Sequence, residues 1–180
     1  AGVEVPSVGV NFATQELRNP GLADNIRWEL ERFGLSSDRL SVEILETVMT
    51  DQPDDVVTRN IAALSAMGCR IELDDFGTGS CSLVALQQLP LDVIKIDHRF
   101  IRDIPYNVSA TDVASAVIAL AHKLHLTVVA EGVETQAQRE FLHQHGCDIA
   151  QGFLYSRPLP AAKMKELLFN QTTVNAVPPS

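Results

Sequence analysis

Polar side chains end several apolar segments of this sequence, at positions that a buried core would not accept. In chain order they are Asn11, Glu43, Asp74 with Asp75, Lys95 with Asp97, Glu131 and Gln151. Acidic side chains that converge repel one another and lose hydration unless cations lie among them. Carboxylate and amide oxygens without His or Cys favour hard ions such as Mg²⁺ or Mn²⁺ over zinc.

The adjacent acids Asp74 and Asp75 make this hypothesis more specific. One of their carboxylates could bridge two ions about 3.5–4 Å apart, an arrangement that activates water and stabilises in-line displacement at phosphorus. Lys95 could then offset the charge that develops on phosphoryl oxygens. Any one of these residues could instead be a solvated strand end, but six separate segments repeat the pattern. The residue types therefore predict metal-dependent hydrolysis of a phosphoester.

The segments that must position these side chains alternate between strand and helix patterns. The predicted strands are residues 5–13, 40–46, 69–75, 91–97, 126–131 and 147–151. The predicted helices are residues 22–33, 53–67, 83–88, 111–125, 135–145 and 161–169. Thr135 and Gln138 give a capping-box pattern at the start of one of these helices. Such an alternation predicts parallel strands joined by crossover helices, and hence an α/β fold.

Two α/β architectures fit this alternation, a doubly wound sheet and a (β/α)8 barrel. The first strand-to-helix turn, from Asn11 onward, has no G-x-G-x-x-G pattern, which disfavours a dinucleotide-binding Rossmann domain. Because side chains alternate across a strand, Glu43 lies on the face opposite Val42 and Ile44. In a barrel the aliphatic face packs under the helices and the polar residues point inward at the mouth, where barrel enzymes keep their catalytic residues. The polar positions therefore favour the barrel.

The composition of the chain excludes or disfavours several classes of protein. The chain has 180 residues, the size of one domain, and its 46% hydrophobic content is too high for a disordered chain. Its net charge of −9 disfavours binding to a nucleic-acid polymer. No apolar run is long enough for a membrane span. The three cysteines, Cys69, Cys81 and Cys147, show no C-x-x-C spacing, which suggests reduced thiols in a cytoplasmic protein. We expect one barrel domain over residues 1–169 and a disordered polar tail over residues 170–180.

Six short motifs occur in a recognisable order. They are residues 10–13 (VNFA), 42–46 (VEILE), 74–79 (DDFGTG), 94–97 (IKID), 131–134 (EGVE) and 151–153 (QGF). Together they resemble the EAL family of bacterial phosphodiesterases, which act on the second messenger cyclic di-GMP. The resemblance covers residues 5–165. It implies a modified (β/α)8 barrel with one antiparallel strand, hydrolysis of cyclic di-GMP to linear pGpG, and in many cases a homodimer.

The resemblance also implies a role for each matching position. The implied ligands of two Mg²⁺ or Mn²⁺ ions are Asn11, Glu43, Asp74, Asp75 and Glu131. The implied catalytic residues are Lys95, Glu131 and Asp75, of which Lys95 orients the hydrolytic water or steadies the phosphate. The implied substrate contacts are Asp97 and Gln151, and Glu134 is a further polar position near the site. The residues implied to couple loop order to metal binding and to dimer contacts are Glu46, Phe76, Gly77, Thr78 and Gly79.

Two departures from the family pattern bear on function. The glycine loop is followed by Ser80-Cys81-Ser82, where an aromatic residue commonly comes first. No Glu-Ala-Leu signature occurs, and only ten residues precede Asn11, so we count about six β/α units. About 70 further residues are expected upstream, together with a fused sensory or regulatory domain in a cytoplasmic protein that could be membrane-anchored. The chain alone would be weakly active or inactive, and the alternative to an enzyme is a catalytically degenerate receptor for cyclic di-GMP or a protein-interaction module.

Overall fold

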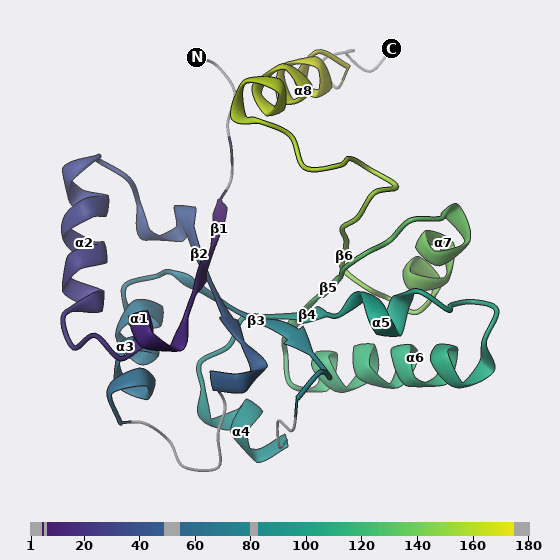
Figure 1. Ribbon diagram of the computed structural model, residues 1–180, viewed down its shortest axis with the longest axis horizontal. Helices are drawn as coiled ribbons and strands as arrows, with labels where there is room; N and C mark the ends of the chain where they lie inside the picture. Colours follow the sequence, from purple (N-terminus) through teal and green to yellow (C-terminus); the bar gives the residue numbers. More distant parts are fainter. Residues whose placement is uncertain (1–4, 6, 49–54, 80–82, 175–180) are drawn as a thin grey trace.

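The computed structural model describes residues 5, 7–48, 55–79 and 83–174 (Figure 1). Its strands are β1 (Val8–Phe12), β2 (Leu40–Leu45), β3 (Arg70–Phe76), β4 (Val93–Ile96), β5 (Thr127–Ala130) and β6 (Ile149–Ala150). Its longer helices are α2 (Leu22–Arg32), α3 (Asp55–Ala66), α4 (Leu83–Gln88), α6 (Val108–Lys123), α7 (Gln136–Gln144) and α8 (Ala161–Val174). Its one-turn elements are α1 (Thr14–Leu17), α5 (His98–Ile101) and the 3-10 turns η1 (Ser37–Arg39) and η2 (Glu46–Val48).

The six strands form one parallel sheet in which spatial order follows sequence order, β1 to β6. Parallel neighbours require crossover connections, and these are right-handed in almost all proteins. A sheet that is always wound in one direction carries its helices on one side, as in a barrel, whereas a doubly wound sheet reverses its order part-way. In Figure 1, α3, α4 and α6 lie on the same side of the sheet. The topology is that of a partial (β/α)8 barrel, as the polar positions predicted.

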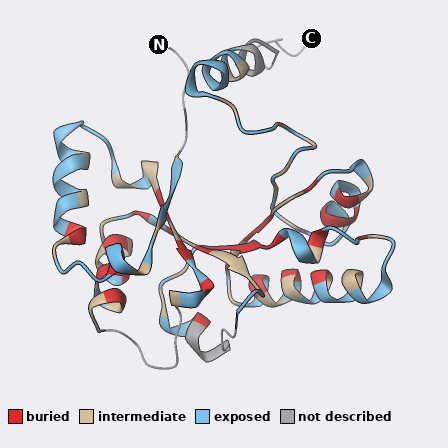
Figure 2. Cartoon of the chain, in the orientation of Figure 1, coloured by how far each residue is buried: buried red, intermediate tan, exposed pale blue. Residues whose placement is uncertain are grey.

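The core lies between the sheet and these helices. Val42 and Ile44 of β2 and Ile71 and Leu73 of β3 are fully buried, and they pack with Ile61 of α3 in the same apolar cluster. Figure 2 shows the buried residues concentrated along the central strands and on the helix sides turned toward them. The intervening strand residues face the other side of the sheet, because side chains alternate along a strand. Burial of the aliphatic face thus fixes where the polar residues must point.

All six predicted strands and all six predicted helices are present, with bounds that differ by a few residues. The one-turn elements were not predicted, because a single turn is too short to show a hydrophobic period. Helix α8 continues to Val174 instead of ending at Phe169, since neither Gly nor Pro interrupts the chain there. Residues 170–174 of the expected tail are therefore helical. Residues 175–180, the start of the helix predicted from residue 53, and Ser80-Cys81-Ser82 lie outside the described residues.

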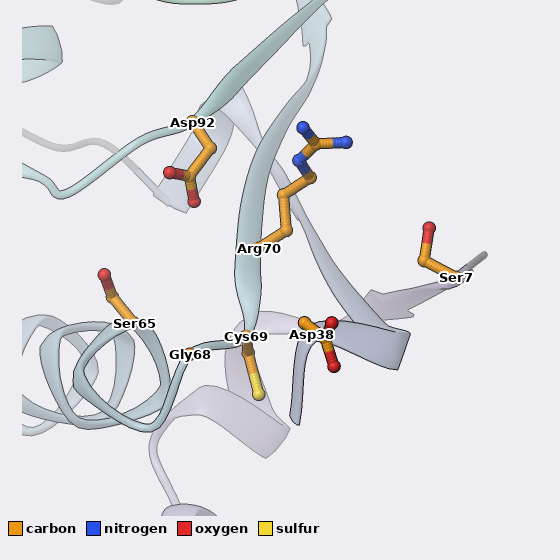
Figure 3. A pocket seen from close by; sticks show the side chains of 7 residues that line it. All are labelled: Ser7, Asp38, Ser65, Gly68, Cys69, Arg70 and Asp92. Carbon is orange, nitrogen blue, oxygen red and sulfur yellow. The ribbon is translucent and has the colours of Figure 1, made fainter. Parts of the chain in front are cut away.

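A hollow of about 470 Å³ lies at the amino-terminal end of the sheet (Figure 3). Its lining residues precede or begin the strands; they are Ser7, Asp38, Ser65, Gly68, Cys69, Arg70 and Asp92. Cys69 and Arg70 point away from each other at the start of β3 in Figure 3. None of the residues that the sequence predicted for the site lines this hollow.

Across the described part of the chain, no helix combines the length and the apolar character that crossing a membrane requires.

Candidate active site

The adjacent acids at the end of β3 stand on an irregular piece of backbone. Leu73 pairs with Ile94 and Phe76 pairs with Ile96, so three steps along β3 match two steps along β4. Asp75 has a φ of 55°, in the left-handed region that non-glycine residues rarely occupy. Consecutive strand residues normally point to opposite faces, and an extra residue of this kind re-aims a side chain. The irregularity lets both Asp74 and Asp75 reach one site.

Lys95 of β4 lies at the centre of the acidic residues. Its Nζ atom is 2.8 Å from Glu43 Oε2, 3.0 Å from Asp74 Oδ1 and 2.8 Å from Glu131 Oε1. The Lys95 side chain is only 8% exposed, and a buried ammonium is tolerated only with charged or hydrogen-bonding partners around it. Burial alone would lower the pKa of Lys95, but the hydrogen bonds to Glu131 and Glu43 raise it well above its ordinary value. Lys95 is therefore a cation that draws together carboxylates from β2, β3 and the end of β5.

The same site holds more negative charge than Lys95 neutralises. Burial raises the pKa of Asp75, and the neighbouring charge of Asp74 raises it further. Burial also raises the pKa of Glu131, although the Lys95 ammonium opposes this shift. Carboxylate oxygens of Asp74, Asp75 and Glu131 all lie within 4.8 Å of one another. A divalent cation would relieve this repulsion, so the residues present fit a metal site with hard oxygen ligands.

Asn11 and Glu43 bring two further predicted ligands to the same end of the sheet. They are directly opposite each other in the β1–β2 register, and paired residues of neighbouring strands share a face. Asn11 is exposed, whereas the Glu43 side chain is 15% exposed and contacts Lys95. The predicted ligands thus come from β1, β2, β3 and β5, at the carboxyl ends of the strands, where barrel enzymes build their sites.

Asp97 lies beneath the site, not on its surface. It is 6% exposed, and its Oδ1 accepts hydrogen bonds from the Arg99 backbone N–H and from Arg99 Nε, each at 2.8 Å. Burial would raise the pKa of Asp97, but these hydrogen bonds and the Arg99 charge lower it. The carboxyl of Asp97 also lies close enough to that of Asp75 to raise the pKa of Asp75 further. Asp97 therefore lies between Asp75 and the first turn of α5.

Three of the predicted residues line one hollow of about 180 Å³. Glu131, Glu134 and Gln151 border it together with Gly132, Gly152 and Phe153. The two segments are held together by the hydrogen bond from Val133 N–H to the Gln151 carbonyl, at 3.0 Å. A side chain at Gly152 would meet the Val133 backbone at 2.3 Å, so only glycine allows this approach. Gln151 and Glu134 are both exposed at this hollow, within reach of a ligand there.

Glu46 holds the predicted glycine loop from below. Its side chain is buried, and Oε2 accepts backbone hydrogen bonds from Gly77 at 2.8 Å and from Thr78 and Gly79 at 3.0 Å. Successive N–H groups that point at one carboxylate form an anion-binding concavity. On its other side, the Phe100 ring lies 2.4 Å from where a Cβ at Gly77 would be. The loop is therefore fixed between Glu46 and α5.

Sequence reasoning did not assign Arg99 and Phe100 to the site, and it treated Gln138 only as part of a helix cap. The cap is present, since Thr135 Oγ1 accepts the Gln138 backbone N–H. The Asp97 side chain accepts the Arg99 N–H at the start of α5, and an Asp before a short turn is a recognisable cap signal. No comparable signal points to Phe100, because its contact with Gly77 depends on the arrangement of two distant segments.

A family model described as the EAL domain matches residues 3–158. The chain belongs to the EAL domain family. It is 43% identical over 168 residues to "Cyclic di-GMP phosphodiesterase NbdA" of Pseudomonas aeruginosa, a match that covers 93% of this chain and 21% of that protein. The chain thus spans about a fifth of the length of this curated relative. The resemblance found in the sequence motifs is confirmed.

Solved EAL structures share the fold described above. The complex "PaMucR Phosphodiesterase, c-di-GMP complex" superposes with a TM-score of 0.81 at 42% identity, covering 88% of this chain and 64% of that one. The Klebsiella pneumoniae protein BlrP1, solved as a manganese and cyclic di-GMP complex, has a TM-score of 0.77 at 32% identity, covering 84% of this chain and 39% of that one. This chain therefore has the same α/β barrel-type fold as the solved EAL domains.

Proposed function

We propose that the complete EAL domain to which this chain belongs hydrolyses cyclic di-GMP to linear pGpG with the help of divalent cations. The observation that carries the proposal is the Lys95 ammonium held by Glu43, Asp74 and Glu131, with Asp75 beside them. This constellation combines a fixed cation with an excess of carboxylates, which is what phosphodiester hydrolysis by metal-activated water requires. The similarity to NbdA and to the PaMucR complex supports cyclic di-GMP as the substrate.

Two Mg²⁺ or Mn²⁺ ions fit the donor set best. The proposed ligands are Asn11, Glu43, Asp74, Asp75 and Glu131. When bound, such ions supply a nucleophilic water at neutral pH and neutralise charge on the phosphate. The manganese complex of BlrP1 supports this choice of ion type.

The chain's own residues prepare the phosphate for attack. The Lys95 ammonium lies at the carboxyl ends of the strands, where the phosphate would bind. There it offsets negative charge that develops on the phosphoryl oxygens. Glu131 and Asp75, whose pKa values are raised by burial, stand beside it as a ligand or water-positioning pair. The proposed substrate contacts are Gln151 and Asp97. Gln151 is exposed, whereas Asp97 is 6% exposed and lies next to Asp75 and the start of α5.

We further propose that the domain forms a homodimer and that it belongs to a larger cytoplasmic protein. The glycine loop, held by Glu46, would couple dimer contacts to metal binding: when the dimer orders the loop, the metal ligands beside it become ordered too. Its residues are Phe76, Gly77, Thr78 and Gly79. The match to about a fifth of NbdA supports a parent protein with further domains, such as an upstream sensory domain. We place the barrel in the cytoplasm because Cys69, Cys81 and Cys147 show no C-x-x-C spacing and fit reduced thiols.

The test is a hydrolysis assay on the longest natural protein that contains this chain. Cyclic di-GMP is incubated with it and Mg²⁺ or Mn²⁺, and pGpG is followed by chromatography. Glu43→Ala, Asp74→Asn and Lys95→Ala should each reduce turnover at least about 10²–10³-fold, the usual cost of removing one electrostatic stabiliser. Tight binding without turnover would instead identify a receptor, and wild-type rates in any variant would contradict the role given to that residue.

A further inference from the structure

The side-chain amide of Gln138, at the start of α7, makes four hydrogen bonds while only 5% exposed. Its Oε1 atom accepts the backbone N–H groups of Glu134 at 2.8 Å and Thr135 at 2.9 Å. Its Nε2 atom donates to the carbonyls of Ile101 at 3.1 Å and Arg102 at 3.2 Å. An amide offers two donors and two acceptor lone pairs, so every capacity of this side chain is used.

The donor half of the amide fixes the end of α5. A helix leaves its last carbonyls without partners inside the helix, and here Gln138 donates to those of Ile101 and Arg102. The Ile101 carbonyl also accepts the Ile104 N–H, at 3.3 Å. The same single turn is capped by Asp97, whose carboxyl lies close enough to that of Asp75 to raise its pKa. It also carries Phe100, whose ring blocks the space beside Gly77. Gln138 therefore holds the far end of an element whose near end contacts the acidic site.

The acceptor half fixes the segment of residues 131–134. This segment starts with Glu131, which contacts Lys95, and ends with Glu134, which borders the hollow beside Gln151. A helix cap needs only the bond from Gln138 to the N-cap backbone N–H, that of Thr135. The bonds to Glu134 and to the two α5 carbonyls go beyond capping. They tie two segments that are about 30 residues apart in sequence.

We infer that Gln138 is a positioning residue, which holds the 131–134 segment and α5 in one relative arrangement and thereby aligns Glu131 with Asp97, Asp75 and the glycine loop. The catalytic consequence rests on the function proposed above, whereas the mechanical link does not. A buried amide suits this task because one rigid group can accept from two N–H groups through its oxygen and donate to two carbonyls through its nitrogen.

The first experiment separates positioning from helix stability. Gln138→Glu keeps the acceptor side but places an oxygen against the Ile101 and Arg102 carbonyls, and Gln138→Met removes both halves without adding charge. Thr135→Ala is the matched control, because it removes a side-chain cap from the same helix start, at a cost of about 1 kcal/mol, and leaves the amide bonds intact.

We expect both Gln138 variants to lower kcat about 10–100-fold, as supporting residues of metal sites do, with a smaller change in KM. The kcat of Thr135→Ala should stay within about threefold of the wild-type value, although its melting temperature should be similar to that of the less stable Gln138 variant. Wild-type kcat in both folded Gln138 variants would overturn the inference. An equal loss of kcat in Thr135→Ala would also overturn it, since stability would then explain the effect.

The second experiment needs no activity. Hydrogen exchange is followed in peptides that cover residues 76–79 and 97–103, with residues 22–32 of α2 as the internal reference. Gln138→Met should speed exchange in both distant peptides and leave the reference unchanged. Faster exchange confined to residues 131–144 would overturn the link. If wild-type protein fails to hydrolyse cyclic di-GMP while the distant peptides respond, the proposed function fails and the link stands.

Discussion

At the scale of single residues, Lys95 serves as an internal counter-ion for the acidic cluster that we propose as the metal site. Its ammonium occupies the space between carboxylates that we assign as metal ligands, at 2.8–3.0 Å from each of three oxygens. A cation there makes the acidic cluster compatible with a folded protein before any ion arrives. The same contacts mean that an incoming metal competes with Lys95 for Glu43, Asp74 and Glu131.

This competition gives a prediction for Lys95→Ala. Without metal, the variant should be less stable than wild type by about 2 kcal/mol or more, because removing one partner of a buried ion pair leaves the others uncompensated. Mn²⁺ should then raise its melting temperature by more than it raises that of wild type, since no ammonium has to be displaced. Thermal unfolding with and without Mn²⁺ measures both effects.

The matched control for this prediction is Arg102→Ala. Arg102 pairs with Asp103 at the surface, where side-chain exposures are 70% and 46% and ion pairs contribute little. This variant should unfold like wild type and show the wild-type Mn²⁺ response. A Mn²⁺ shift in Lys95→Ala no larger than in Arg102→Ala would contradict the counter-ion role.

At the scale of elements, the glycine loop owes its shape to a carboxylate from another segment. Three backbone N–H groups converge on Glu46 Oε2, and a bond to an ionised acceptor is about twice as strong as a neutral one. Glu46→Gln retains an acceptor oxygen but loses the charge. The loop should therefore open more often while the rest of the fold holds.

Limited proteolysis measures this opening. Chymotrypsin should cut after Phe76 several-fold to about tenfold faster in Glu46→Gln, because about 1.4 kcal/mol of local stability corresponds to tenfold in population. Glu29→Gln is the control, since Glu29 forms an exposed pair with Arg32 on α2. Equal cleavage rates in wild type and Glu46→Gln would show that the carboxylate does not hold the loop.

The elements also show where sequence reasoning succeeds and where it stops. Alternation around Glu43 and Lys95 predicted both the strands and the face on which these side chains lie, because burial of Val42 and Ile94 enforces it. The left-handed Asp75 was not predictable, since two adjacent acids carry no sign of a bulge. Neither was the central place of Lys95, which depends on strands that meet only in three dimensions.

At the scale of the whole molecule, Asp148 joins the layers at the carboxyl half of the chain. Its Oδ2 accepts the Val128 N–H of β5 at 2.8 Å and lies 3.0 Å from His122 Nε2 of α6, just before β6 begins. Burial would raise the pKa of Asp148, but the hydrogen bonds from Val128 and His122 lower it below its ordinary value. One carboxylate thus links a helix to two neighbouring strands.

The sign of this pKa shift fixes how stability depends on pH. A carboxylate with a depressed pKa in the folded state stabilises the protein above its unfolded pKa, about 4, and loses that contribution as pH falls through the folded value. Asp148→Asn should therefore be less stable than wild type at pH 7, by no more than about 1 kcal/mol because the pair is partly exposed. The difference should shrink below about pH 4, as measured by urea unfolding across pH 3–7. Asp112→Asn, an exposed change on α6, should show no such trend, and a gap in Asp148→Asn that persists undiminished at pH 3 would exclude the carboxylate charge as its cause.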